Sequence, residues 1–256
     1  MMKISLIALA LMAPVSAFAD APAADTAFAI PTEVLPTGKA TGGKFLEGGF
    51  SVGAYKFFAL NYTTGDASIK VFGAGKQKTR NVTKFRFLKS DDTVIASGKC
   101  LIRGEENSSV FGFSVDQKNS GLYKCEFTDL AAADYALEVV VPQFAATSVG
   151  GFMSIEKDEP HRWDLVKAHM RYKGVDYDAV PTELDHKREA FHHQPIVGYI
   201  ISREGKPVGR VDFDANWPNK GTMTVPVAEA DGREAVIFFA SELLVMPDVY
   251  ASSQAF

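Results

Sequence analysis

Cysteine is scarce in this sequence, since Cys100 and Cys125 are the only two among 256 residues. This scarcity excludes a disulfide-rich scaffold and a metal centre built from more than two thiolates. The pair also lacks the CxxC spacing that is typical of redox motifs. Because an isolated pair in an exported chain most often forms a disulfide, we predict a bond between Cys100 and Cys125.

Long hydrophobic runs are absent beyond the N-terminus. Residues 1–19 contain one lysine, an uncharged run rich in Leu, Ala and Met, and the small residues Ala17 and Ala19, which is the pattern of a secretory signal peptide. No later run approaches the ~20 apolar residues of a membrane helix, so we expect no transmembrane segment in the mature chain. The expected location is periplasmic or secreted, after cleavage near Ala19.

Positive charge is not in excess. Without residues 1–19 the chain has 26 basic and 31 acidic residues, which gives a net charge of −5. This balance argues against bulk binding of nucleic acid, although it permits local basic patches. Nucleic acid is therefore not among the expected partners.

Residues that favour strands and turns make up most of the remaining chain. Short segments rich in Phe, Val, Tyr and Ile recur, separated by Asp, Gly and Pro, as is typical of antiparallel β structure. The turns at 89–93 and 202–207 predict hairpins. The segment 235–240, AVIFFA, is among the expected strands. The sequence therefore predicts an all-β protein, an antiparallel β-sandwich.

The domain organisation follows from the same pattern. Residues 20–43 have little periodicity and are expected to be a flexible tether. Residues 44–148, with the disulfide, are expected to form a β domain. Residues 149–256 are expected to form a second, similar domain or to continue a single sandwich. A short helical or irregular insertion is expected near 175–195, with a helix beginning at Thr182.

If residues 149–256 are a second copy of the unit in residues 44–148, the two halves of the sequence can be aligned. This alignment makes the predicted duplication testable. It places Cys100 on Phe213 and Cys125 on Phe238. If the two halves are copies of one unit, the two phenylalanines should pack against each other where the first half has its disulfide.

The stretch 166–173, VKAHMRYK, alternates apolar and cationic residues at every position. Side chains of a strand point to opposite faces with a period of two, so we predict a strand with its apolar residues in the core. A second basic segment, 76–89, shows the same alternation around Phe85 and Phe87. The candidate binding residues on the outward faces are Lys167, His169, Arg171, Lys173, Lys84 and Arg86.

Two interpretations of these cationic faces stay open. They are either the solvated faces of amphipathic strands, or a docking surface for an anionic polymer or headgroup. In the second case the partner would be cell-wall glycan, lipopolysaccharide or another envelope protein, and binding would weaken as salt rises.

All five histidines lie between residues 161 and 193. A metal-binding protein or metal-dependent hydrolase that uses His186, His192 and His193 is therefore the alternative function. No HExxH spacing places two histidines on one helical face, and no residue stands out as a catalytic nucleophile. We expect a non-enzymatic binding or structural protein of the envelope, without a cofactor.

Overall fold

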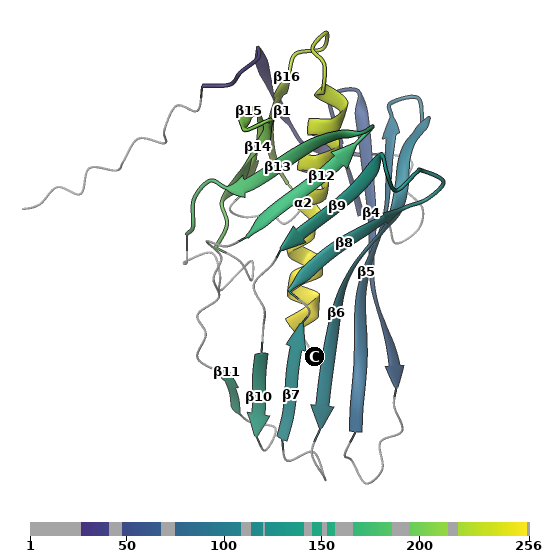
Figure 1. Ribbon diagram of the computed structural model, residues 1–256, viewed down its shortest axis with the longest axis vertical. Coiled ribbons are helices and arrows are strands. Elements are labelled where there is room, and N and C mark those ends of the chain that lie inside the picture. Colours follow the sequence, from purple (N-terminus) through teal and green to yellow (C-terminus); the bar gives the residue numbers. More distant parts are fainter. Residues whose placement is uncertain are drawn as a thin grey trace, which may run out of the picture.

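The computed structural model describes residues 27–40, 48–67, 75–108, 114–119, 121–140, 145–149, 153–156, 166–185, 195–214 and 220–254. Within these ranges the protein consists of antiparallel strands and one long helix (Figure 1). The all-β prediction is therefore confirmed, with the addition of this helix.

The elements have the following bounds. The strands are β1 (Thr32–Pro36), β2 (Gly38–Lys39), β3 (Gly48–Val52), β4 (Tyr55–Ala67), β5 (Gly75–Lys89), β6 (Val94–Ser108), β7 (Ser114–Asn119), β8 (Leu122–Phe127), β9 (Tyr135–Val140), β10 (Ala145–Val149), β11 (Met153–Glu156), β12 (Lys167–Tyr172), β13 (Val175–Pro181), β14 (Gly198–Arg203), β15 (Lys206–Phe213) and β16 (Gly221–Pro226), and the helix is α2 (Arg233–Gln254).

All the described strands belong to one sheet. Its main path runs β1-β16-β15-β14-β13-β12-β9-β8-β6-β5-β4-β3-β2, and β7, β10 and β11 extend from β6. The two halves of the chain meet in this sheet where β9 pairs with β12. The sandwich prediction is thereby corrected, because a sandwich has two sheets packed face to face. Here a helix, instead of a second sheet, covers the inner face.

One extended segment joins the two ends of the sheet. Only Thr37 separates β1 from β2, yet β1 pairs with β16 and β2 pairs with β3. The backbone N–H of Thr37 donates to the carbonyl of Gly221 at 3.0 Å, and the N–H of Gly221 donates to Thr37 Oγ1 at 3.0 Å. The sheet is therefore a nearly closed, barrel-like wall. The part of the expected tether between residues 32 and 39 belongs to this wall.

The helix α2 lies inside the wall (Figure 1). All residues from 235 to 246 are buried, and only Ser241 and Glu242 among them are polar. The strand predicted at 235–240 is wrong. An apolar run fits a buried strand or a buried helix equally well by periodicity, and length separates the two. The buried segment continues to Met246 without Gly, Pro, Asn or Asp, which is the length of a helix.

Aromatic side chains from four strands pack around Phe238 of α2. Its ring centroid lies 5.3–6.4 Å from the rings of Phe57, Phe85, Phe87, Phe127 and Tyr172. Burying such a side chain stabilises the fold by about 3 kcal/mol. The alignment of the two halves fails at this point, because Cys125 lies on a strand and Phe238 on a helix. Phe213 packs edge to face on Tyr199 instead.

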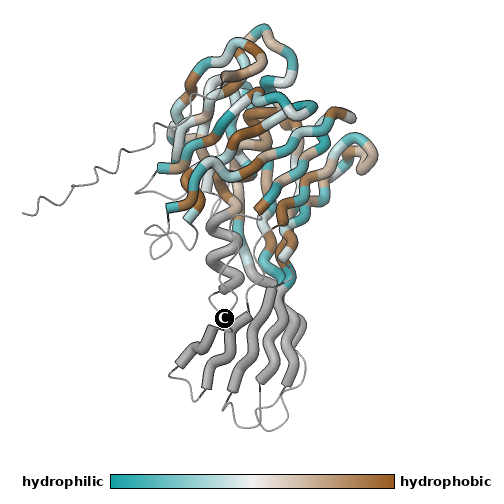
Figure 2. The backbone as a smooth tube through the Cα atoms, turned by 60° about the vertical axis from the view of Figure 1, so that its left-hand side comes forward, coloured by the Kyte–Doolittle hydropathy of each residue, from teal (hydrophilic) through white to brown (hydrophobic). Residues whose placement is uncertain are grey.

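The strand predicted at the cationic stretch is confirmed as β12. Its apolar residues are buried, together with Val166 before it, and Lys167 and His169 are exposed. Figure 2 shows the same alternation of hydrophobic and hydrophilic residues along other strands of the wall. Among the described residues no helix combines the length and the apolar character needed to cross a membrane.

The insertion predicted near 175–195 begins later than expected. Residues 175–181 form β13, in which Tyr177 and Ala179 are buried. The helix predicted from Thr182 is wrong at its start, because Leu184 forms a β-bridge with Ile196. Residues 186–194 lie outside the described ranges.

Both predicted hairpins are confirmed. The turn between β5 and β6 holds Asp92 at a φ of 67°, and the turn between β14 and β15 holds Glu204 and Gly205 at 52° and 74°. Gly, Asn and Asp favour such left-handed conformations, so Gly205 and Asp92 suit their positions.

Candidate functional site

Carboxylates on β13 face the cationic side of β12. Arg171 donates two hydrogen bonds to Asp176, from Nε to Oδ1 at 2.7 Å and from Nη2 to Oδ2 at 3.1 Å. This bidentate contact is the main reason why the pKa of Asp176 lies below its usual value. His169 Nδ1 lies 3.0 Å from Asp178 Oδ1. The antiparallel register causes these contacts, since it pairs His169 with Asp178 and Arg171 with Asp176.

The end of this row contacts the helix. Lys173 Nζ donates to Glu234 Oε1 at 2.8 Å, and the hydroxyl of Tyr172 donates to the same oxygen at 2.9 Å. The hydrogen bond to Glu234 raises the pKa of Lys173. Lys167 is exposed and forms no ion pair with any residue in the described ranges. Neighbouring acids therefore neutralise most of the row.

A denser group of cations lies on the outer face of β5, β6 and β8. We call it the basic face, and it consists of Arg80, Lys84, Arg86, Lys99, Arg103 and Lys124. The inward neighbours of these residues include Phe85, Cys100 and Ile102, which are buried. Because side chains alternate along a strand, the cations share the opposite side.

Like charges oppose each other in this face. The register of β5 and β6 pairs Arg80 directly with Arg103, and Lys84 directly with Lys99. Lys99 also forms an ion pair with Glu126 at 3.0 Å on β8. Like charges directly opposite in a sheet destabilise it. Lys124 likewise forms an ion pair with Glu138, its cross-strand partner on β9. Like-charge pairs therefore distinguish this face from the β12 row, where the register matches His169 and Arg171 with acids.

Aromatic rings of β4 support two of these cations. Lys84 Nζ lies 5.3 Å from the ring centroid of Tyr62, and the guanidinium carbon of Arg86 lies 5.2 Å from that of Phe58. A cation over a ring face gains electrostatic attraction while it stays charged. These contacts hold Lys84 and Arg86 over the outer surface of the sheet.

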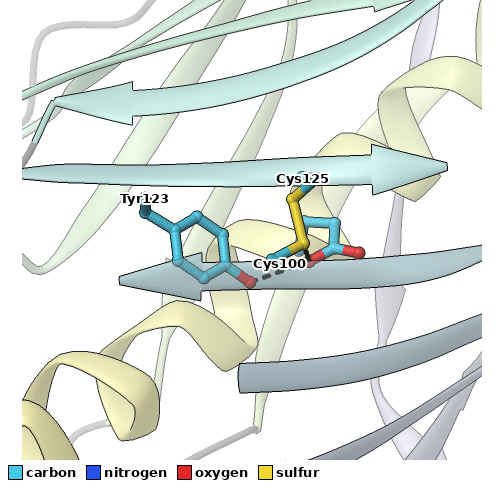
Figure 3. Close-up of a disulfide and its surroundings, with 4 residues drawn as sticks. Cys100, Tyr123 and Cys125 are labelled. Atoms are coloured by element: carbon cyan, nitrogen blue, oxygen red, sulfur yellow. Dashed lines mark hydrogen bonds between the residues drawn. A yellow bond between two sulfur atoms is a disulfide. The ribbon is translucent and has the colours of Figure 1, made fainter. Parts of the chain in front are cut away.

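Inside the wall, the predicted disulfide is confirmed (Figure 3). Cys100 and Cys125 are direct cross-strand partners on β6 and β8. Glu242 of α2 reaches the same place, and its Oε2 lies 3.7 Å from Cys100 Sγ. The hydroxyl of Tyr123 donates to this oxygen at 3.3 Å. Glu242 is 1% exposed, and its Oε1 has no hydrogen-bond partner among the described residues.

Burial sets the protonation of this cluster. Desolvation raises the pKa of Glu242 to about 8, against the lowering effect of the hydrogen bond from Tyr123. Burial and the nearby Glu242 also raise the pKa of Tyr123 well above its usual value. At neutral pH the carboxyl group is therefore mostly protonated, and the core around the disulfide carries little charge.

The cluster is also the group in the described chain that comes closest to a metal site. Ligand atoms of Cys100, Cys125 and Glu242 lie within 4.8 Å of one another. Metal ions bind cysteine as the thiolate, and both sulfurs are joined in the disulfide. These residues therefore serve as a cross-link beside a neutral carboxyl.

The histidine alternative falls largely outside the described ranges. His161, His186, His192 and His193 all lie outside the described ranges, so a metal site built from them stays a prediction. His169 is the described histidine, and it lies on the outer face of β12.

One motif was missed in the sequence. Residues 49–53, GFSVG, match the G-x-S-x-G pattern of a nucleophile elbow, which requires a strand, a sharp turn and a helix around the serine. Ser51 instead lies within β3, just before the hairpin turn to β4. No histidine from the described ranges lies on a neighbouring strand, so the motif does not build a catalytic dyad there. The local structure therefore gives Ser51 a place in the sheet.

Comparisons of this chain with protein-family models, with curated proteins and with solved structures found no match. The architecture itself defines the class of protein: an antiparallel, barrel-like sheet around a buried helix.

Proposed function

We propose that this chain is an exported binding protein that docks an anionic polymer or headgroup of the cell envelope through the basic face. It performs no covalent chemistry of its own. The observation that carries the proposal is the register of β5 and β6, which sets Arg80 against Arg103 and Lys84 against Lys99.

This register has an energetic cost that an anion offsets. The Lys84–Lys99 pair destabilises the sheet by up to about 1 kcal/mol, and the ion pair of Lys99 with Glu126 offsets part of this. A phosphate or carboxylate placed between two such cations replaces repulsion with two attractive contacts. Binding of a ligand to the folded state alone also stabilises that state.

The dimensions of the face suit an extended ligand. Arg80 and Arg86 are six residues apart on β5, which is about 20 Å on strand geometry. The face is three strands wide, so β5 and β8 lie about 10 Å apart. Cations spread over such an area contact several anionic groups at once. Phosphorylated lipopolysaccharide carries several such groups.

The proposal favours this face over β12 because of local charge. A ligand phosphate at Arg171 or Lys173 would compete with Asp176 or Glu234, which already accept hydrogen bonds from these cations. Docking at β12 would therefore lose existing ion pairs as it gains new ones. At the basic face this applies to Lys99 and Lys124, whereas Lys84 contacts the ring of Tyr62 and keeps that contact when it binds an anion.

Two matched double variants test the proposal. Lys84→Gln with Lys99→Gln removes two charges from the basic face, and Lys167→Gln with Arg171→Gln removes two from β12. Affinity for immobilised lipopolysaccharide is measured from 50 to 300 mM salt, about the range in which screening of exposed charges becomes strong. A dephosphorylated sample of the same lipid serves as the ligand control.

We expect the first variant to lose about tenfold in affinity, because two exposed charge contacts together contribute on the order of 1.4 kcal/mol. Its binding should also depend less on salt. The β12 variant should bind within about twofold of the wild type. Equal losses in both variants, or equal binding of the dephosphorylated lipid, would refute docking at the basic face.

A further inference from the structure

A pocket of about 300 Å³ opens at the beginning of α2. Its wall comes from the segment before β1, from β13, from the hairpin of β14 and β15, and from the turn that leads into the helix. The backbone N–H of Ala29 donates to the carbonyl of Pro207 at 2.8 Å and fixes the first of these parts beside the hairpin. Four separate parts of the chain thus converge on one hollow.

The inner wall of the pocket is apolar. Ile30, Val208, Pro226 and Val236 line it, and Val208 and Val236 are buried. The ring of Tyr177, also buried, forms part of the same wall. An apolar group of a ligand would find here the kind of surface that removes it from water.

Charged side chains of both signs surround the opening. Arg203, Glu204 and Lys206 come from the hairpin, and Asp231 comes from the turn before α2. Arg203 Nη1 donates to Asp231 Oδ2 at 2.8 Å, and the side chain of Asp231 is 86% exposed. An ion pair with so exposed a partner contributes little to stability, so Arg203 can exchange it for another carboxylate.

The turn brings its backbone close to the pocket wall. Gly232 has a φ of 84°, and a Cβ atom at this position would lie 2.9 Å from the hydroxyl oxygen of Tyr177. A glycine is needed for this close approach.

The volume limits the size of the occupant. Ligand pockets of proteins begin at about this volume. A small metabolite fits this space.

From the apolar wall, the two cations and the two carboxylates, we propose that the pocket binds a small zwitterion with an apolar body, the chemistry of an apolar amino acid. The ligand carboxylate binds to Arg203 and Lys206. The ammonium group binds to Glu204 and Asp231, and the side chain packs on Val208 and Val236. The site is independent of the basic face, because the two share no residue.

The test uses L-leucine as the probe, with calorimetric titration of the full-length chain. N-acetyl-leucine lacks the ammonium charge, and leucinamide lacks the carboxylate. We expect saturable binding of leucine and a loss of at least tenfold for each analogue, or about 1.4 kcal/mol. Equal binding of all three compounds would overturn the zwitterion assignment.

Two exposed substitutions test the location without disturbing the core. Glu204→Gln and Lys206→Gln should each weaken leucine binding about fivefold. Lys89→Gln, at the end of β5, makes the same kind of change away from the pocket and should leave binding unchanged. The absence of saturable binding for leucine, methionine, valine and phenylalanine would overturn the proposal, as would leucine binding that neither pocket variant weakens.

Discussion

Replacing Glu242 with glutamine removes a carboxyl group that the core buries between the disulfide and Tyr123. The folded protein holds the pKa of this group at about 8, whereas the ordinary value is 4.5. A raised carboxyl pKa means that the folded state binds the proton more tightly than the unfolded state does. The contribution to stability is therefore complete below pH 4.5 and is lost as the pH rises towards 8.

The magnitude follows from the shift. Each pKa unit corresponds to 1.36 kcal/mol, so the wild type loses about 5 kcal/mol of unfolding free energy from this group over the whole titration, and about 4 kcal/mol of it between pH 4.5 and pH 8. Glutamine has nearly the same shape and does not titrate. Glu242→Gln should therefore match the wild type near pH 4.5 and exceed its stability by about 3 kcal/mol at pH 7.

Urea unfolding at pH 4.5, 7 and 8.5 measures the effect. The relevant quantity is the difference in unfolding free energy between the variant and the wild type at each pH, because other titrating groups cancel in that difference. Glu229→Gln makes the same chemical change at an exposed position and should differ from the wild type by less than about 0.5 kcal/mol throughout. A Glu242→Gln difference that does not grow with pH would refute the reasoning.

Three further variants test the packing of the core by urea unfolding at fixed pH. Cys100→Ala with Cys125→Ala removes a cross-link between residues with a sequence separation of 25 and should lower the unfolding free energy by about 3.5 kcal/mol. A loss below about 1 kcal/mol would contradict a structural role for the bond. Phe238→Ala should lower the unfolding free energy by about 3–5 kcal/mol because five aromatic rings lose their partner. A loss of under about 0.5 kcal/mol, as is usual for surface substitutions, would show that α2 does not pack inside the sheet. Gly98→Ala should cost about 1–3 kcal/mol because its Cβ would lie 2.3 Å from the carbonyl oxygen of Glu126, and a neutral effect would contradict this close approach.

Local patterns in the sequence predict the strands well. The alternation at 166–173 depends only on the side-chain period of two, and β12 has this period. The turn residues at 89–93 and 202–207 determine hairpins by their own backbone preferences. The disulfide follows from the number of cysteines and the expected export.

The architecture depends on information that such patterns lack. The segment 235–246 is buried on every side and apolar except for Ser241 and Glu242, because the wall surrounds it, so its period gives no sign of a helix. When this segment is interpreted as a strand, the second half of the chain is expected to be another β unit like the first. The predictions of a sandwich and of a duplicated unit depend on that interpretation. The closure of the sheet through Thr37 depends on pairing between residues about 180 positions apart.

Charge pairing, too, is only partly predictable from the sequence. The sequence identifies Lys84 and Arg86 as outward cations, but register decides that Lys84 opposes Lys99 and that Arg171 opposes Asp176. Glu242 escapes sequence analysis because its neighbours Tyr123 and Cys100 are more than a hundred residues away. Charge pairing across strands is a property of the fold.

Amide hydrogen exchange with and without phosphorylated lipopolysaccharide tests the central claim most directly, because it locates the bound ligand on the sheet. Docking at the basic face predicts that added protection concentrates in β5, β6 and β8, and that it disappears in the Lys84→Gln, Lys99→Gln variant. Protection concentrated in β12 and β13, or no change in any strand, would contradict the account.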